Sequence, residues 1–204
     1  AAAATTPIAA ANDPQRQIMR VLLDLKTMIR QRSQVLRQLE RQHRDALQRL
    51  TRVAARFEHG GLAHCLRVGA VSALLADALG KPLRWCDMLF DAAPVHDLGN
   101  LDVPHDIVHK HGRLSGAQWA LVRQHPLAGA RLLGNAGDPL HELAAEIALN
   151  HHEKWDGSGY PARRLRTNIP LPARIGAVAD FVDALSHDAP HHPALAEAHV
   201  FELL

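Results

Sequence analysis

The stretch HHEKWDGSGYP at positions 151–161 sets two adjacent histidines in front of a segment that is rich in glycine and ends in proline. Positions 139–151 have the apolar spacing of an amphipathic helix, which the glycines and the proline then end. Adjacent side chains on a helix diverge by about 100°. His151 and His152 therefore suit two different metal ions, or one ion where the helix unwinds.

The composition favours helices along the whole chain. Hydrophobic residues make up 47% of the 204 residues and aromatic residues only 4%, and alanine and leucine dominate the apolar set. This mixture favours helices over strands, and no strand-like alternation stands out. The sequence therefore predicts an all-α protein. Its formal net charge of +2 gives no reason to expect a nucleic acid polymer as a partner.

Three features bear on the cellular compartment. Cys65 and Cys86 form no CxxC pair and are too few for a disulfide scaffold, so we expect two reduced thiols. A run of about 18 apolar residues is absent, so we expect no membrane span. Residues 1–12 lack the basic start and apolar core of a signal peptide and are predicted to be a linker. Together these features predict a cytoplasmic protein.

Positions 13–58 predict one long helix. Asp13 is a suitable N-cap, Pro14 is a suitable first helical residue, and no glycine interrupts the segment. Apolar residues recur in steps of four and three, with polar interruptions at Arg32 and His43: Ile18, Leu22, Leu25, Ile29, Leu36, Leu39, Ala46, Leu50, Val53 and Phe57. Such a heptad seam predicts a parallel coiled coil between two copies of the chain. The alternative is a helix that folds back on its own domain.

Ten of the 15 histidines cluster between positions 59 and 152. Several histidines and aspartates fall at the ends of predicted helices: His64, His96, Asp97, His125, His151, His152 and Asp180, with Asp183 one turn further on. Asp97 follows an apolar segment, and a carboxylate buried there needs a cation or a proton. Imidazoles and carboxylates without thiolates suit iron, manganese, zinc or nickel better than calcium or magnesium.

These residues belong to a longer pattern that resembles the HD-GYP family. His96-Asp97-Leu98-Gly99 and Gly159-Tyr160-Pro161 are similar to the two signatures that name the family. IPLPARI at 169–175 and DFVDAL at 180–185 also follow the family's order and spacing. The resemblance covers about residues 60–190. It implies an all-helical HD fold that hydrolyses cyclic di-GMP to pGpG, GMP or both at a centre of two or three metal ions.

The resemblance also implies a role for each candidate residue. The first metal would be bound by His64, His96, Asp97 and Asp180, and Asp97 would bridge to a second metal bound by His125, His151 and His152. The expected catalytic residues are His96, Asp97 and Asp183, of which Asp183 would orient ligating imidazoles. Substrate contacts are expected from Asn100, Lys110, Gly159, Tyr160, Pro161 and His192. The cofactor would be two divalent ions, iron or manganese, with zinc, nickel or magnesium as alternatives.

Three positions depart from the family pattern. Gly60 stands where members with three metals have a glutamate four residues before the first histidine, and Glu58 is out of that register, which favours two metals. Asn100 replaces a lysine and Ala189 an arginine that supply charge to the substrate phosphate, although His192 partly replaces a following basic residue. A neutral donor bonds phosphate less strongly than a charged one. The alternative function is therefore a catalytically weak or inactive module for regulation, protein interaction or nucleotide binding.

The expected organisation is a linker at 1–12, a coiled-coil signalling helix at 13–58 and an HD-GYP domain at 59–204 whose C-terminal helices could continue further. In multidomain signalling proteins, such a helix links an upstream sensor or receiver domain to an output domain, so we expect such a domain before residue 1. The expected partners are cyclic di-GMP, a second copy of the chain and a diguanylate cyclase with a GGDEF domain.

Overall fold

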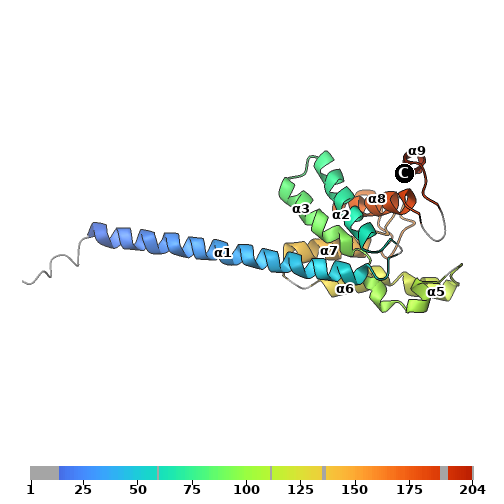
Figure 1. Cartoon of the computed structure of the whole chain (residues 1–204), viewed down its shortest axis with the longest axis horizontal. Coiled ribbons are helices and arrows are strands. Elements are labelled where there is room, and N and C mark those ends of the chain that lie inside the picture. Colours follow the sequence, from blue (N-terminus) through green and yellow to red (C-terminus); the bar gives the residue numbers. More distant parts are fainter. Residues whose placement is uncertain (1–13, 59, 111, 135–136, 189–192, 204) are drawn as a thin grey trace, which may run out of the picture. The chain divides into compact units, whose positions relative to one another are not determined.

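The described part of the chain is built from helices (Figure 1). The computed structural model describes residues 14–58, 60–110, 112–134, 137–188 and 193–203. Its elements are α1 (Pro14–Ala54), α2 (Gly61–Ala78), α3 (Leu83–Ala92), η1 (Ala93–Val95), η2 (Leu98–Asp102), α4 (His105–Val108), α5 (Gly116–Val122), α6 (His125–Leu133), α7 (Pro139–Asn150), η3 (Arg166–Asn168), α8 (Leu171–Ser186) and α9 (Glu197–Glu202). Within these residues, β-type pairing is limited to an isolated bridge between Asp156 and Leu165. The prediction of an all-α protein is confirmed.

The chain divides into two compact units, Ala1–Gln42 and His43–Leu204. In the first unit, the described residues form one continuous stretch of α1, and its large apolar side chains are exposed. Leu25, Leu36 and Leu39 of the predicted seam, for example, are 51%, 49% and 44% exposed. Among the described residues, these three side chains are left largely exposed, and the coiled coil stays a prediction.

The last turns of α1 belong to the second unit and pack into its core. Leu47, Thr51 and Ala54, which are spaced by four and three residues, are buried, whereas Val53 of the predicted seam is 39% exposed. These turns pack on the chain's own domain, as the alternative to a coiled coil expected. The compact unit accordingly begins at His43, before the predicted domain boundary at 58/59.

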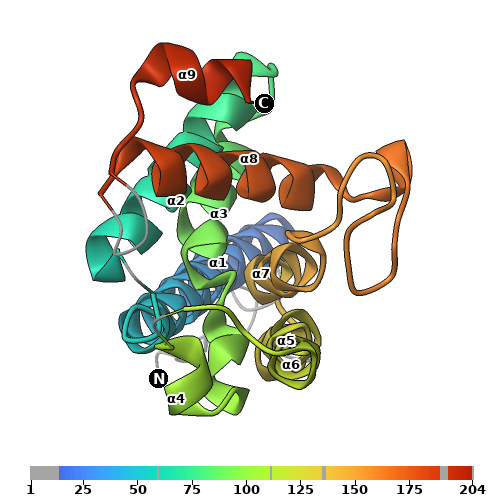
Figure 2. The same ribbon diagram turned by 90° about the vertical axis from the view of Figure 1, so that its right-hand side faces the viewer.

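Helices α2, α3, α7 and α8 form the centre of the second unit (Figure 2). Helix α3 packs on α2 and α7, and α8 packs on the same two helices, so the four enclose one apolar core. Helix α6 packs on both α7 and η2. Gly99 of η2 and Gly129 of α6 face each other, and a Cβ at Gly99 would collide with the carbonyl oxygen of His125. Because neither glycine has a side chain, η2 can pack directly against the first turn of α6.

Among the described residues, α2 is the one helix whose length and composition would allow it to cross a membrane, and 33% of it is buried. The prediction of no membrane span rests on the absence of an uninterrupted apolar run, and α2 contains His64, Arg67 and Asp77. Its polar side chains nevertheless have specific partners, since His64 and Arg67 both bond the carboxylate of Asp183 in α8. These bonds and the packing against α3 and α8 are the contacts of a core helix in a bundle.

The burial of Leu47 provides a test of how α1 packs. Its side chain is fully buried, so Leu47→Ala leaves a cavity, and we expect the free energy of unfolding to fall by about 3 kcal/mol. The control is Leu23→Ala on the same helix, where Leu23 is 56% exposed and the expected loss is below about 0.5 kcal/mol. Urea unfolding followed by circular dichroism measures both losses. Equal losses would contradict the packing of α1 in the second unit.

Candidate metal centre

His96 and Asp97 lie where the chain changes its helix type. Helix α3 ends at Ala92, and the chain continues through the short 3-10 helices η1 and η2, with His96 and Asp97 between them. Pro94 in η1 has no amide hydrogen and cannot continue the hydrogen-bond ladder of an α-helix. The resulting turn places His96 inside the unit, where it is 2% exposed.

Four histidines are held in place through their Nδ1 atoms. Three of them donate from Nδ1 to the backbone carbonyl oxygen three residues earlier: His96 to Ala93 at 3.0 Å, His125 to Val122 at 2.7 Å and His151 to Ala148 at 2.9 Å. A carbonyl oxygen can only accept, so Nδ1 keeps its proton and the neutral imidazole has a free lone pair on Nε2. His64 Nδ1 lies 2.7 Å from Asp183 Oδ2. Such bonds fix the tautomer and orientation of metal-binding imidazoles.

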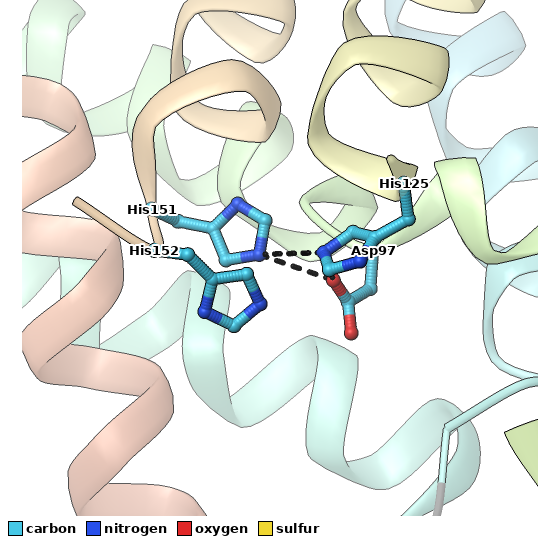
Figure 3. Close-up of side chains that lie close together, drawn as sticks. All are labelled: Asp97, His125, His151 and His152. Atoms are coloured by element: carbon cyan, nitrogen blue, oxygen red, sulfur yellow. Dashed lines mark hydrogen bonds and ion pairs between the residues drawn. The ribbon is translucent and has the colours of Figure 1, made fainter. Parts of the chain in front are cut away.

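Donor atoms of His125, His151 and His152 converge on Asp97 (Figure 3). One donor atom from each of these four residues lies within 4.8 Å of the other three. The Nε2 atoms of His125 and His151 lie 3.0 and 3.1 Å from Asp97 Oδ1 and 3.4 Å from each other. Two unprotonated Nε2 atoms and a carboxylate oxygen at these distances need a cation or additional protons between them. The four side chains therefore have the composition of a cation site.

A second group of donor atoms comprises Glu58, His64 and His96, again within 4.8 Å of one another. His64 Nε2 lies 3.8 Å from Glu58 Oε2 and 3.4 Å from Asp180 Oδ1. His96 Nε2 lies 3.8 Å from the same oxygen of Asp180. Glu58 Oε1 is buried and has no hydrogen-bond partner within the described part of the chain. A carboxylate oxygen in this position fits a site that takes up a cation.

Glu58 lies among these donor atoms, although the family pattern had put it out of register as a ligand. The family pattern places the glutamate four residues before His64, where this chain has Gly60. Helix α1 ends at Ala54 and α2 begins at Gly61, so Glu58 lies in the turn between the two helices. A Cβ at Gly60 would collide with the side chain of His64. The turn instead brings Glu58 to His64, and the break between the two helices was the signal for it.

Burial and charge determine the protonation of this cluster. Burial lowers the pKa of His152 to about 2, so its imidazole is neutral near pH 7. Burial acts to raise the pKa of Asp97, but the charge of His96 and hydrogen bonds from two further histidines hold it well below its usual range. For Glu58, burial and the charges of Asp97 and Asp180 raise the pKa well above its usual value. A bound cation would relieve the repulsion among these carboxylates.

Comparison with known proteins agrees with this geometry. The sequence profile of the HD domain family matches residues 25–201. The chain belongs to the HD domain family. Its HD-GYP type, predicted from the signatures at 96–99 and 159–161, is confirmed, since its relatives include proteins named cyclic di-GMP phosphodiesterases.

Three curated relatives illustrate the similarity of this HD domain to known proteins. The chain is 42% identical to the 3'3'-cGAMP-specific phosphodiesterase 2 of Vibrio cholerae over 133 residues. This matched segment is 65% of the chain and 25% of the relative. It is 39% identical over 128 residues to a cyclic di-GMP phosphodiesterase of Thermotoga maritima, covering 63% and 35%. It is 36% identical over 159 residues to the cyclic di-GMP phosphodiesterase response regulator RpfG of Xanthomonas campestris, covering 78% and 42%. The chain thus spans less than half the length of each.

Within the HD domain, Asp183 lies behind His64 rather than among the converging donor atoms. Arg67 donates from Nε to Asp183 Oδ1 and from Nη2 to Oδ2, the latter at 2.9 Å. His64 Nδ1 contacts Oδ2 of the same carboxylate, which is 4% exposed. This position suits the predicted orienting role of Asp183 toward the His64 ring. Arg67, which no sequence signal singled out, holds Asp183 in place.

Four of the predicted substrate-contact residues lie at or next to the cluster. Asn100 is buried, and its Nδ2 donates to Asp97 Oδ2 at 3.1 Å, so its amide supports the carboxylate. The ring of Tyr160 stacks on that of His152, with ring centres 4.7 Å apart. Gly159 permits the loop to close, because a Cβ there would collide with the backbone of residues 152–154, and Pro161 follows Tyr160 through a cis peptide bond.

The other two predicted substrate contacts are not part of the cluster. Lys110 Nζ donates to Gln118 Oε1 at 2.8 Å and lines a separate cavity. His192 lies outside the described residues, as does Ala189, which marked one of the departures from the family pattern.

Glu153 fixes the loop that carries Tyr160. Its carboxylate is buried and accepts from the backbone amides of Ala162 and Arg164 at 2.6 and 2.8 Å. These bonds close the segment between Glu153 and Arg164 and hold Tyr160 near His152. The position of Glu153 directly after two histidines suggests a metal ligand, so the sequence gives no sign that it anchors the loop.

Replacing Asp97 tests whether the two groups hold cations. We expect the wild-type protein to bind about two equivalents of a transition metal. Asp97→Ala should lose nearly all of it, because this carboxylate contacts both groups. Glu58→Gln should lose about one equivalent, since only the second group contains Glu58. Elemental analysis by mass spectrometry measures the metal content.

The matched control for this measurement is Asp102→Ala, because Asp102 is an exposed carboxylate of η2 and should leave the metal content unchanged. If Asp97→Ala is folded by circular dichroism and still binds as much metal as the wild type, the donor atoms do not form a cation site.

Proposed function

We propose that this HD domain is the catalytic part of a metal-dependent phosphodiesterase that hydrolyses cyclic di-GMP to pGpG, GMP or both in bacterial second-messenger signalling. The observation that carries the proposal is the convergence of imidazole Nε2 atoms on Asp97, with the Nδ1 protons already bonded to backbone carbonyls. Relatives that are named cyclic di-GMP phosphodiesterases support the substrate class.

Two divalent cations would occupy the two groups of donor atoms. One would be held by Asp97, His125, His151 and His152, and the other by Glu58, His64, His96 and Asp180, with Asp97 between them. Imidazole and carboxylate ligands suit iron or manganese, with zinc, nickel or magnesium as alternatives. Two such cations supply a water of lowered pKa as the nucleophile and offset the charge of the phosphodiester oxygens.

The contribution of the chain itself is to hold these groups in place before the substrate arrives. His125 and His151 keep their Nδ1 protons on backbone carbonyls, so the neutral form of each ring offers Nε2 to a cation. Asn100 donates to the second oxygen of Asp97 and orients that carboxylate. Groups that are already oriented need little reorganisation during the reaction, which favours the transition state.

A second substrate, 3'3'-cGAMP, is favoured by the relatives with that specificity in their names. Three of them, all from Vibrio cholerae, are 42%, 31% and 36% identical to this chain. Both substrates are cyclic purine dinucleotides joined by phosphodiester bonds, so a metal centre would treat them alike. Discrimination between them therefore depends on contacts to the bases.

A regulatory module is the alternative function. Asn100 faces Asp97, and Lys110 lines a separate cavity, so neither side chain offers a cation to a phosphate at the cluster. If phosphate binding is weak for this reason, the metal centre would act as a structural brace. The loop at 159–161 would then contact a partner such as a GGDEF diguanylate cyclase. A cytoplasmic location belongs to both versions of the proposal.

Turnover with bound metal separates the two functions. The protein is loaded with Fe(II) or Mn(II) and incubated with cyclic di-GMP or 3'3'-cGAMP, and the linear dinucleotide and mononucleotide products are followed by chromatography. We expect hydrolysis of cyclic di-GMP to pGpG or GMP, and none by Asp97→Ala. Protein that contains metal by elemental analysis but hydrolyses neither cyclic dinucleotide would rule out the enzyme and favour the regulatory module.

We also propose that α1 joins two copies of the chain through positions 18–39 of the seam and links them to an upstream sensor or receiver domain. The last turns of α1 pack in their own domain, which leaves the earlier positions for a partner helix. The name of the Xanthomonas campestris relative, a response regulator, supports an upstream receiver domain.

Charge in the seam tests the dimer. Leu25→Glu combined with Leu36→Glu would bury two carboxylates between the helices, so we expect the variant to be a monomer while the wild type is a dimer. Multi-angle light scattering at micromolar concentration measures the mass. Leu23→Glu is the control, because Leu23 is exposed and lies outside the seam. A monomeric wild type would contradict the coiled coil.

A further inference from the structure

The guanidinium group of Arg123 lies outside the metal cluster and contacts two aromatic rings. The guanidinium carbon of Arg123 lies 5.4 Å from the centre of the Tyr160 ring and 5.9 Å from that of Trp119. Tyr160 in turn stacks on His152, with 4.7 Å between ring centres. A row of stacked groups therefore leads from the cluster to the end of α5, where Arg123 is the C-terminal cap residue.

The row ends at a basic cavity. Trp119 lines a cavity of about 420 Å³ together with Lys110, Arg113 and apolar residues, and no carboxylate of the described residues contributes to its lining. Lys110 is oriented by Gln118, whose Oε1 accepts from Lys110 Nζ at 2.8 Å and from the amide of Ser115 at 3.0 Å. Trp119 itself is 46% exposed, so its ring is accessible to a ligand.

The positive charge of Arg123 is available to a ligand. In the part of the chain that the structure describes, Arg123 contacts the two rings and pairs with no carboxylate. A guanidinium that lies against aromatic rings keeps its N–H groups free, and these groups match the geometry of a phosphate. Bases stack readily on exposed aromatic side chains next to such cations. Arg123 and Trp119 thus combine the two kinds of contact that bind a nucleotide.

We propose that Arg123, Trp119 and the cavity form a subsite for the half of the cyclic dinucleotide that is not being hydrolysed. Arg123 binds the second phosphate, and Trp119 stacks on the attached purine, with Lys110 and Arg113 beside it. The inference rests on the proposed function. It names a charged phosphate contact in this chain, which Asn100 does not provide because its amide faces Asp97.

The position of the subsite favours a substrate of two nucleotides. Successive contacts connect His152 to Tyr160, Tyr160 to Arg123 and Arg123 to Trp119, at 4.7, 5.4 and 5.9 Å. A small diester bound at the cluster would not extend as far as Trp119, whereas a dinucleotide with one phosphate at the cluster presents its second phosphate and base further out. Changes at Arg123 therefore affect a dinucleotide more than a small phosphodiester.

Kinetics on two substrates test this subsite. The Mn(II)-loaded wild type, Arg123→Gln and Arg123→Lys are compared on cyclic di-GMP and on bis(p-nitrophenyl) phosphate, a small diester without a second phosphate. For Arg123→Gln we expect KM for cyclic di-GMP to rise about tenfold, and the preference for cyclic di-GMP over the small diester to fall by the same factor. Arg123→Lys keeps the charge but loses the planar fork and should lie between the two.

Arg131→Gln is the matched control, because Arg131 is an exposed arginine in the last turn of α6 and should behave as the wild type. Thermal unfolding and metal content are measured for each variant. An unchanged KM for cyclic di-GMP in Arg123→Gln, with an active wild type, overturns the subsite and leaves the proposed function standing. An equal loss on both substrates, or loss of metal, also overturns it. A wild type that hydrolyses only the small diester overturns the proposed function and the subsite together.

Discussion

The buried carboxylate of Asp97 is the group on which the arrangement of the second unit depends. Its Oδ1 faces His125 and His151, and its Oδ2 accepts from Asn100. A carboxylate in such surroundings is stable only when cations or protons offset its charge. With a proton on each Nδ1 alone the imidazoles are neutral, so the charge must come from further protons on Nε2 or from a cation. The elements that meet at Asp97 must therefore fit closely, and the side-chain-free crossing at Gly99 lets η2 and α6 do so.

Helix ends, rather than helix faces, provide the converging donor atoms. His125 is the first residue of α6, and His151 is the cap residue of α7. The last carbonyls of a helix lack amide partners within it. The Nδ1 of His151 donates to one such carbonyl, that of Ala148, and His125 does the same for Val122 at the end of α5. One bond thus completes a helix end and fixes the direction of Nε2, so the fold and the donor geometry depend on the same contacts.

The helical class and most of the cluster could be predicted from local sequence signals. Contacts between segments that are distant in the sequence could not. The predicted ligands all lie in or beside the two groups, because each follows a helix boundary marked in the sequence or matches the family pattern. Glu58 was missed because its place depends on the path between two helices. Arg67 was missed because its partner Asp183 lies 116 residues away. Lys110 was misplaced because its hydrogen bond with Gln118 directs it into another cavity.

In the proposed function, metal binding and substrate discrimination would depend on different parts of the domain. The imidazoles of His96, His125 and His151 are oriented by carbonyls three residues earlier. The Tyr160 loop is fixed by Glu153, and the start of α5 by the reciprocal bonds of Ser115 and Gln118. The bonds of Glu153, Ser115 and Gln118 involve no donor atom of the cluster, so exposed side chains of α5 such as Trp119 can change without altering those bonds or the ligands. Relatives that are 36–42% identical to this chain yet named for different cyclic dinucleotides agree with such a separation. A substitution near Trp119 would therefore alter which substrate is bound, and one near Asp97 would alter whether any is hydrolysed.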